Sequence, residues 1–206
     1  MLKFYHAPQS CSNGILLLLH EVGADFETKV VDLRNGDQRG AEYLSLNPKG
    51  KVPALVLTDG STLTEFPAIA TWLADCHPQA GLAPADTTAR ARTIEALDFI
   101  VGSVHMRGFT FDKVPQKFLP DEEGQATLRA HGRSEVNKGL KALSDILGDK
   151  EYLLGDFSAA DAALFYVLEW AEEDGEYDTP ANLQACLDRI KTRPAYAAAA
   201  PLLTRT

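Results

Sequence analysis

The sequence lacks several features that would assign a class of protein at once. Its 206 residues include only three widely spaced cysteines, too few for a disulfide framework and consistent with a reducing cytosol. No apolar run is long enough to cross a bilayer, and the chain does not open with a charged segment followed by an apolar core. We therefore expect a soluble, cytoplasmic, globular protein of one or two domains.

Positive charge is also scarce, and the net charge is −9 at pH 7. This argues against nucleic acid as the main partner, because Lys and Arg drive phosphate binding. No metal motif and no glycine-rich phosphate loop are present, so we predict no metal. Four histidines have no partner at ligand spacing: His6, His20, His77 and His131. The stretch from Lys29 to Lys51 carries five basic and three acidic residues. It is either ordinary surface scatter or a mouth for an anionic small molecule.

The first 77 residues alternate between strand and helix patterns. Strand patterns occupy residues 2–5, 26–31, 54–57 and 61–63, and the pair Asp59-Gly60 predicts a hairpin between the last two. Helical spacing occupies residues 12–22, 41–46 and about 69–77. The order βαβαββα predicts a small mixed sheet with helices on its faces.

Residues 78–86 have a linker composition with Pro78, Gly81 and Pro84. Beyond them only helical patterns appear, at residues 87–111, 128–147, 158–170, 183–190 and 194–203. We therefore predict an α/β domain over 1–77, a linker over 78–86 and an all-helical bundle over 87–206. Within that bundle, Ser158 and Asp161 have the spacing of a helix capping box.

The most informative segment runs from Asn47 to Leu55 and contains Val52-Pro53. A proline has no N–H to donate to a sheet, so it is an unusual start for a strand. A cis Val52–Pro53 bond would turn the N–H and C=O of Val52 outward. A peptide-like ligand would then pair with Val52 as an additional strand.

Two predicted helix starts carry candidate chemistry. At the first, either Cys11 is a reactive thiol whose pKa is lowered by the helix N-terminus, or Ser12 donates to a thiolate of a ligand. The alternative is that Cys11 is a small buried core residue and Ser12 an ordinary N-cap. Position 14, where a Cys-x-x-Cys pair would place its second cysteine, is Gly14, which argues against dithiol redox cycling. At the second, Thr64 is a candidate N-cap. There Glu65 either binds an ammonium group or only complements the helix dipole.

A third candidate is His105, which shares a helical stripe with Asp98, Val101 and Phe109. Such a stripe would face a cleft between the two domains. His105 is then a proton-transfer group or a hydrogen-bond donor. The alternative is an ordinary packed or surface histidine.

Taken together, these residues resemble the cytosolic glutathione transferases of bacteria, above all the beta class. The resemblance covers essentially the whole chain. Its motifs are Pro8 with Ser10-Cys11-Ser12, the segment 47–55, Leu63-Thr64-Glu65, His105 with Gly108-Phe109, and Ser158-Ala-Ala-Asp161 with the helix to Trp170. It implies a thioredoxin-like domain followed by a helical domain, glutathione as co-substrate, a homodimer and a role in detoxification.

The resemblance also implies roles for individual residues. Val52 would pair with the cysteinyl part of glutathione beside cis-Pro53, and Glu65 with the N–H of Phe66 would hold its γ-glutamyl end. The predicted catalytic residues are Cys11, Ser12 and His105. The predicted glutathione-binding residues are Cys11, Arg34, Lys51, Val52, Pro53, Glu65, Phe66 and Asp98, with Arg39 an alternative to Arg34. The predicted walls of the electrophile pocket are Met106, Phe109 and Phe111.

Three departures from the family pattern leave alternatives open. Phe66 stands where serine or another small residue is usual, and Asp98 stands where the beta class has asparagine. The loop before Cys11 is one residue longer and the loop after Asp32 is one shorter, so Arg34 and Arg39 are both candidates for the expected basic residue. The first hypothesis is a transferase that activates the glutathione thiolate, through Ser12, Asn13 or Cys11, for attack on a small hydrophobic electrophile. The second is a thiol-disulfide reductase acting through Cys11. The third is a glutathione-binding or interaction module without turnover.

Overall fold

The computed structural model describes residues 1–205, and its contacts divide the chain into two compact units. Unit 1 comprises residues 1–83 together with the segment that begins at Lys191, and unit 2 comprises residues 84–190. Each unit has a core of its own.

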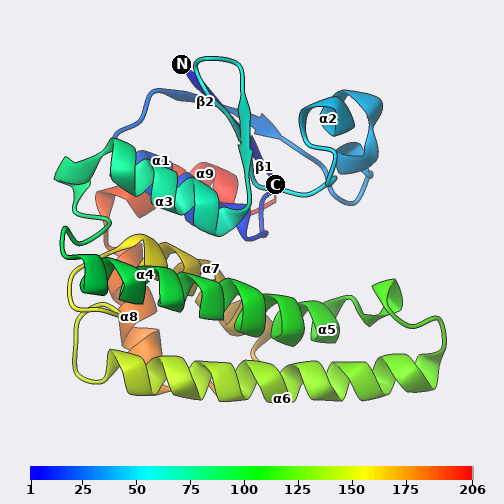
Figure 1. The fold of residues 1–206 in the computed structure, drawn as a ribbon. Coiled ribbons are helices and arrows are strands. Elements are labelled where there is room, and N and C mark those ends of the chain that lie inside the picture. Colours follow the sequence, from blue (N-terminus) through cyan, green and yellow to red (C-terminus); the bar gives the residue numbers. More distant parts are fainter. Residues whose placement is uncertain (206) are drawn as a thin grey trace. The chain divides into compact units, whose positions relative to one another are not determined.

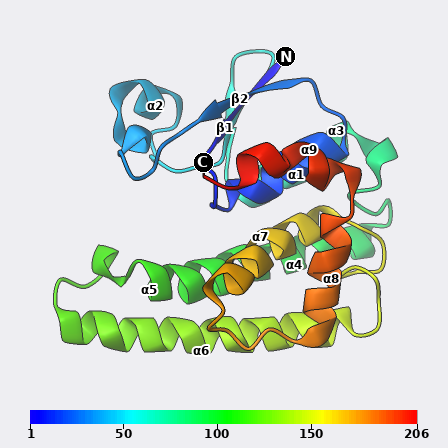
Figure 2. The same cartoon turned by 180° about the vertical axis from the view of Figure 1, so that it is seen from behind.

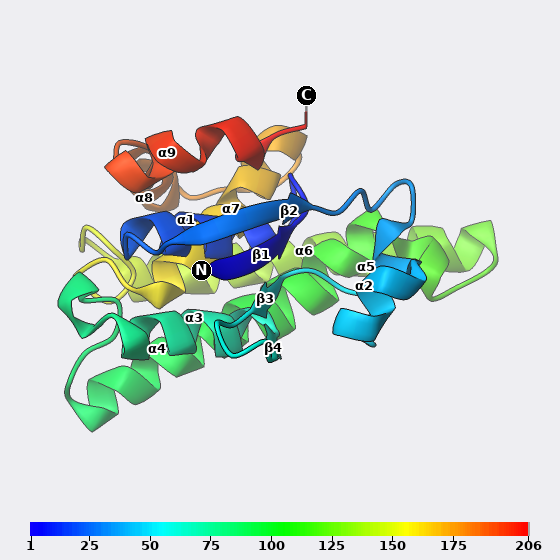
Figure 3. The same cartoon turned by 90° about the horizontal axis from the view of Figure 1, so that it is seen from above.

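Unit 1 is built on a four-stranded mixed sheet in the order β2-β1-β3-β4 (Figure 1 and Figure 3). The sequence predicts the mixed sheet and its strands but not their spatial order. Its strands are β1 (Leu2–His6), β2 (Phe26–Val30), β3 (Ala54–Val56) and β4 (Thr62–Thr64). β1 pairs in parallel with β2 and antiparallel with β3. Along β1 the buried residues Leu2, Phe4 and His6 alternate with Lys3 and Tyr5, so these two sets lie on opposite faces of the sheet.

The helices of unit 1 are α1 (Ser12–Glu21), α2 (Ala41–Leu46), α3 (Phe66–Cys76) and α9 (Pro194–Leu203), with short 3-10 turns η1 (Asp37–Arg39) and η2 (Pro78–Ala80). Figure 2 shows α1, α3 and α9 side by side, with α2 apart from them. Every residue from Ile15 to Leu19 is fully buried. A helix that buries all its faces in this way is a central element, and α1 packs against both α3 and α9.

The grouping of α9 with unit 1 differs from the predicted ranges, which assign it to a helical domain over 87–206. Ala195, Ala199 and Leu203 are buried, and the carbonyls of Leu202 and Leu203 accept hydrogen bonds from residues 6–13. A helical pattern in the sequence does not reveal which distant element the helix packs against.

Unit 2 is entirely helical apart from isolated bridges near Tyr152. Its elements are α4 (Thr87–Phe99), the π-helix η3 (Ile100–Phe109), α5 (Thr110–Lys113), η4 (Pro115–Lys117), α6 (Glu122–Leu147), α7 (Ala159–Asp174) and α8 (Ala181–Lys191), the last ending at the boundary of unit 1. Figure 1 shows α6 as the long element of this unit. It starts six residues before the prediction because the carboxylate of Asp121 caps its first turn by accepting from the Gly124 N–H.

Two glycines let η3 and α6 approach closely. A Cβ at Gly108 would lie 2.7 Å from Cγ2 of Val136, and one at Gly139 would lie 2.6 Å from Cγ2 of Val104. Neither position has room for a side chain. This close packing fixes the helix that carries His105.

The predicted capping box at the start of α7 is confirmed. Asp161 is fully buried, and its carboxylate accepts from the N–H of Ser158 at 2.8 Å and the N–H of Leu153 at 2.8 Å. The Ser158 hydroxyl donates to it as well, at 2.9 Å. Burial raises the pKa of Asp161, and these hydrogen bonds act in the opposite direction.

Candidate functional site

The candidate site in unit 1 begins where Cys11 meets Val52. The Cys11 thiol lies 3.7 Å from the carbonyl oxygen of Val52, and the Val52–Pro53 bond is cis, as the sequence predicts. The Val52 side chain packs against a core cluster that includes Tyr43. Within residues 1–205 the N–H of Val52 has no hydrogen-bond partner. The chain therefore presents an unpaired strand-like donor beside a thiol.

The loop before Val52 is held from α2. The carbonyl of Lys51 accepts a hydrogen bond from the Tyr43 hydroxyl at 2.6 Å and another from Nδ2 of Asn47 at 2.7 Å. The side chain of Lys51 is exposed. Sequence reasoning missed Tyr43, because one aromatic residue in a short helix carries no signal of what its hydroxyl contacts.

Glu65 adopts a left-handed backbone conformation, with φ at 73°. Such a conformation costs a residue other than glycine on the order of 1–3 kcal/mol and is found mainly where function requires it. The exposed carboxylate of Glu65 pairs with Nζ of Lys49 at 2.6 Å. The same ammonium group donates to Oγ1 of Thr64 at 2.9 Å. The predicted capping role of Thr64 is wrong, because Thr64 ends β4 and Glu65 occupies the N-cap position of α3.

The thiol of Cys11 is not activated in this structure. Burial of the sulfur raises its pKa to about 12, and the Glu65 carboxylate adds to the rise. The Cys11 N–H and the charge of Lys51 act in the opposite direction but are outweighed. The sequence-based expectation of a lowered pKa is therefore wrong, because desolvation dominates over the helix N-terminus.

Ser12 occupies a buried network rather than an open site. Its exposure is 0%, and its hydroxyl lies 2.7 Å from Nδ1 of His6 and 2.7 Å from the Ser10 hydroxyl. It also accepts from the Ala7 N–H at 3.0 Å. This geometry opposes the predicted role of Ser12 as a direct donor to a ligand, since a hydroxyl without exposed surface cannot reach one.

The remaining predicted residues of the glutathione set lie in varied surroundings. Phe66 is only 3% exposed, so its ring fills the interior at the start of α3. Pro53 is buried, whereas Arg34 is exposed and donates its backbone N–H to Asp32 at 2.9 Å. Arg39 is exposed as well, and the structure does not choose between the two arginines. Asp98 is exposed on α4 of unit 2.

In unit 2, His105 lies within an aromatic cluster. Its Nδ1 is 3.2 Å from the hydroxyl of Tyr166. Its ring meets Tyr166 and Trp170 edge to face, with centroids 5.6 Å and 4.9 Å away. The π-helical backbone at His105 is a rare form that often marks functional sites. The cluster links η3, which carries His105, to α7, which carries Tyr166 and Trp170.

The three predicted pocket walls differ in accessibility. Phe109 is only 2% exposed and packs edge to face against Trp170 and Tyr177. Its prediction as a pocket wall is wrong, because its ring belongs to the core of unit 2. Met106 is 38% exposed. Phe111 is half-buried against Phe118.

Sequence reasoning missed the buried carboxylate of Asp112, which contacts Tyr177, a ring that packs against Phe109. Asp112 accepts from the hydroxyl of Tyr177 and from Nε of Arg133, the latter at 3.1 Å. Burial and the neighbouring Asp112 raise the pKa of Tyr177. Asp112 and Tyr177 are 65 positions apart, so no local pattern reveals the pair.

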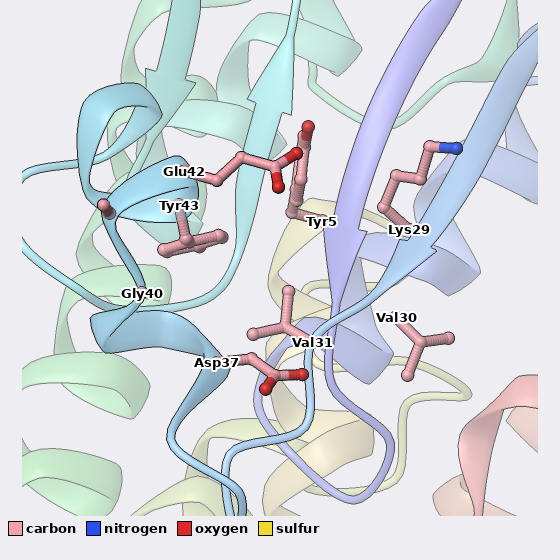
Figure 4. Close-up of a pocket in the computed structure, with 9 residues that line it drawn as sticks. Tyr5, Lys29, Val30, Val31, Asp37, Gly40, Glu42 and Tyr43 are labelled. Carbon is pink, nitrogen blue, oxygen red and sulfur yellow. The ribbon is translucent and has the colours of Figure 1, made fainter.

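A separate pocket of about 490 Å³ lies in unit 1 between β1, β2 and α2 (Figure 4). Tyr5 lines it and meets Tyr43 edge to face. Adjacent residues of a strand point to opposite faces, and His6 contacts α1, so this pocket lies on the other face of the sheet from Ser12. Its Lys29 is already paired with Glu27 at 2.6 Å. None of the predicted glutathione-binding residues line it.

Within residues 1–205 no three His, Cys, Asp or Glu side chains group as metal ligands. The helices described there are also too short or too polar to span a membrane. Cys11, Cys76 and Cys186 are free thiols.

Two family models match the chain. The glutathione S-transferase N-terminal domain matches residues 10–76, and the C-terminal domain of the same family matches residues 126–199. The fold is thus the predicted one, with a thioredoxin-like domain followed by a helical domain.

Individual relatives agree with the family models. Glutathione S-transferase GstA of Escherichia coli O157:H7 is 38% identical, over 94% of this chain and 94% of its own. A glutathione transferase homolog from Sulfitobacter, solved with bound glutathione, has a TM-score of 0.90 at 30% identity, covering 98% of this chain and 97% of its own. A beta-class enzyme of Sphingomonas chungbukensis has a TM-score of 0.82 at 36% identity, covering 98% and 100%. The chain belongs to the glutathione S-transferase family, and its predicted assignment as a glutathione transferase is confirmed.

Proposed function

We propose that unit 1 binds glutathione along Val52 and that the glutathione thiolate attacks a small hydrophobic electrophile. A thioether bond then forms between the glutathione sulfur and the electrophilic carbon, and a leaving group such as halide departs with the bonding electron pair. The observation that carries this proposal is the meeting of Cys11 and Val52 at 3.7 Å, beside an unpaired Val52 N–H. The cysteinyl unit of glutathione pairs with Val52 as an added strand. Its thiol then lies next to Cys11 and the first turn of α1.

In this arrangement Cys11 acts as a hydrogen-bond donor, not as a nucleophile. A thiol with a pKa of about 12 keeps its proton at neutral pH. Its present acceptor, the Val52 carbonyl, is distant, so the S–H group turns to the bound thiolate at little cost. Lowering the pKa of a thiol from about 8.5 toward 6–7 corresponds to about 2–3 kcal/mol.

The γ-glutamyl end of glutathione binds at the start of α3. Its ammonium group replaces Nζ of Lys49 on the Glu65 carboxylate, which the ion pair at 2.6 Å already shows to be accessible to a cation. Both side chains of that pair are more than half exposed, so the exchange costs little. The ligand carboxylate approaches the first turn of α3, where the helix dipole favours an anion.

The other predicted ligand residues complete the proposal. Lys51 and Arg34 are exposed cations suited to the glycine carboxylate, and Asp98 stays a predicted glutathione-binding residue. Met106 on η3 and Phe111 on α5 are the accessible apolar side chains we assign to the electrophile, and His105 is also carried by η3. The homodimer, the cytoplasmic location and the role in detoxification rest on family resemblance alone. Size-exclusion chromatography with light scattering tests the dimer.

The protonated state of Cys11 weighs against the reductase hypothesis. Disulfide exchange through Cys11 requires its thiolate, and burial disfavours that form. Turnover separates the transferase from a binding module without activity. Phe66 is the departure that motivates the latter hypothesis, yet its ring is buried and leaves the backbone at the start of α3 in a helical position.

The pH–rate profile of conjugation with a reactive aryl halide tests the proposal. We expect kcat/KM to rise with an apparent pKa at least one unit below that of free glutathione. Calorimetric titration with glutathione and with its S-methyl derivative serves as the binding control. A profile that follows the pKa of free glutathione contradicts thiol activation, and binding without turnover across a panel of electrophiles identifies a binding module instead.

A further inference from the structure

The last carbonyls of α9 are satisfied by the first loop of the chain. The carbonyls in the last turn of a helix have no partner within the helix. Here Nε2 of His6 lies 2.8 Å from the Leu202 oxygen. The Leu203 oxygen accepts from the N–H of Gln9 at 2.9 Å and from Nδ2 of Asn13 at 3.1 Å. The end of α9 is therefore tied to the residues on both sides of Cys11.

The partners of His6 fix its tautomer. A carbonyl oxygen only accepts, so Nε2 of His6 carries the proton that is donated to Leu202. In the neutral ring Nδ1 then accepts the hydroxyl proton of Ser12, 2.7 Å away. Ser12 in turn accepts from the N–H of Ala7, and its hydroxyl lies 2.7 Å from the hydroxyl of Ser10. Burial lowers the pKa of His6, which favours this neutral form.

The hydrogen bonds around His6 and the end of α9 hold the Ala7–Ser12 loop, which includes one residue with a positive φ angle. Gln9 has a left-handed backbone with φ at 62°, and its N–H is the group that donates to Leu203. His6 and Ser12 are both fully buried. A change of loop geometry that breaks their hydrogen bonds leaves buried polar groups without partners, which is costly. Cys11 is next to Ser12 in the chain and occupies the N-cap position of α1, but its side chain makes no capping hydrogen bond to that helix.

We propose that His6 and the C-terminal end of α9 are positioning elements that hold the Ala7–Ser12 loop and keep Cys11 beside Val52. Ser12 takes part as a relay between His6 and this loop, not as a donor to the ligand. The catalytic consequence rests on the proposed function. The effect on the surroundings of Cys11 stands without it.

The opposite end of α9 offers a matched control. Arg193, just before α9, donates from Nε to Glu21 at the end of α1 at 3.1 Å. The two helices thus run antiparallel and are tied at both ends. Arg193→Ala loosens the same helix away from Cys11, whereas a change at His6 loosens it at the loop.

The experiment follows alkylation of Cys11 by iodoacetamide across pH in full-length protein that carries Cys76→Ser. Peptide mass mapping separates Cys11 from Cys186, which is buried and whose pKa is about 12. We compare His6→Phe, His6→Gln and Arg193→Ala with the parent, well below their unfolding temperatures. The same variants are assayed for kcat and for KM for glutathione.

We expect His6→Phe to speed alkylation of Cys11 at fixed pH about tenfold, which corresponds to one pKa unit. KM for glutathione should rise more than kcat falls. His6→Gln keeps a donor for Leu202 and should lie between the parent and His6→Phe. Arg193→Ala should lower stability but leave the alkylation profile unchanged.

A folded His6→Phe with the alkylation profile and KM of the parent overturns the proposal. If His6→Phe does not fold, identical profiles for His6→Gln and Arg193→Ala overturn it. If glutathione does not bind at all, the proposed function fails while alkylation still decides the positioning role.

Discussion

The two units organise their candidate residues in different ways. In unit 1 the proposed site combines the backbone of Val52 and the starts of two helices with the side chains of Cys11 and Glu65. In unit 2 the candidate His105 belongs to a side-chain cluster, with edge-to-face contacts that run through Trp170 to the buried Phe109. Backbone recognition suits an invariant ligand, because main-chain groups persist through sequence change. A side-chain cluster suits a variable one, because each ring can be replaced separately.

The largest effect we expect falls on the stability of unit 2. Asp161→Ala removes an acceptor that serves the N–H groups of Leu153 and Ser158 and the Ser158 hydroxyl. Leaving these buried donors without a partner should cost about 3 kcal/mol or more. Urea denaturation measures the loss, with Asp149→Ala as an exposed control. Calorimetry should show unchanged glutathione affinity, and an affinity loss without a stability loss would show that Asp161 belongs to the site.

A smaller effect should separate the two substrates. Tyr177→Phe removes the hydroxyl that donates to Asp112 behind Phe109, which should cost about 2 kcal/mol because the acceptor is charged. Tyr177 packs against Phe109, and Phe109 packs against Trp170 in the His105 cluster. Through this cluster KM for the electrophile should rise severalfold, while KM for glutathione stays constant. Tyr152→Phe, in the same unit but outside the cluster, is the control. Equal changes in both KM values would mean that the two units do not divide the substrates.

The smallest effect concerns the ion pair at the start of α3. Lys49→Met frees the Glu65 carboxylate for the ligand ammonium, so glutathione should bind up to about fivefold more tightly, as expected for loss of an exposed ion pair. Lys29→Met makes the same change of net charge on the other face of the sheet. Titration calorimetry at low and high salt compares the two variants. Weaker binding in Lys49→Met alone would assign Lys49 to the ligand.

The sequence predicted what is encoded locally. The segment from Asn47 to Leu55 predicts a loop with a cis proline, and Ser158 with Asp161 predicts a capping box. Both predictions depend only on residues a few positions apart in the sequence. The four strand segments and the start of the first helix follow from similar short patterns. These features cover the fold and most of the backbone part of the site.

What the sequence did not reveal depends on contacts between distant segments. The pKa of Cys11 follows from burial that no local pattern reports. His6 meets Leu202 across 196 positions, and this contact turns Ser12 away from the ligand. Phe109 shares a helical stripe with His105 but ends in the core, because periodicity gives a face and not its depth.

The central claim is that glutathione ionises beside a protonated Cys11 thiol. Its most direct test is an ultraviolet titration of the thiolate of bound glutathione in the parent, Cys11→Ala and Cys11→Ser. We expect the thiol of bound glutathione in the parent to have a pKa at least one unit below that of free glutathione. In Cys11→Ala this pKa should return toward the free value. In Cys11→Ser, which keeps a hydrogen-bond donor, it should stay near the value of the parent. A bound pKa equal to the free one, or the same lowered pKa in Cys11→Ala, would contradict the central claim.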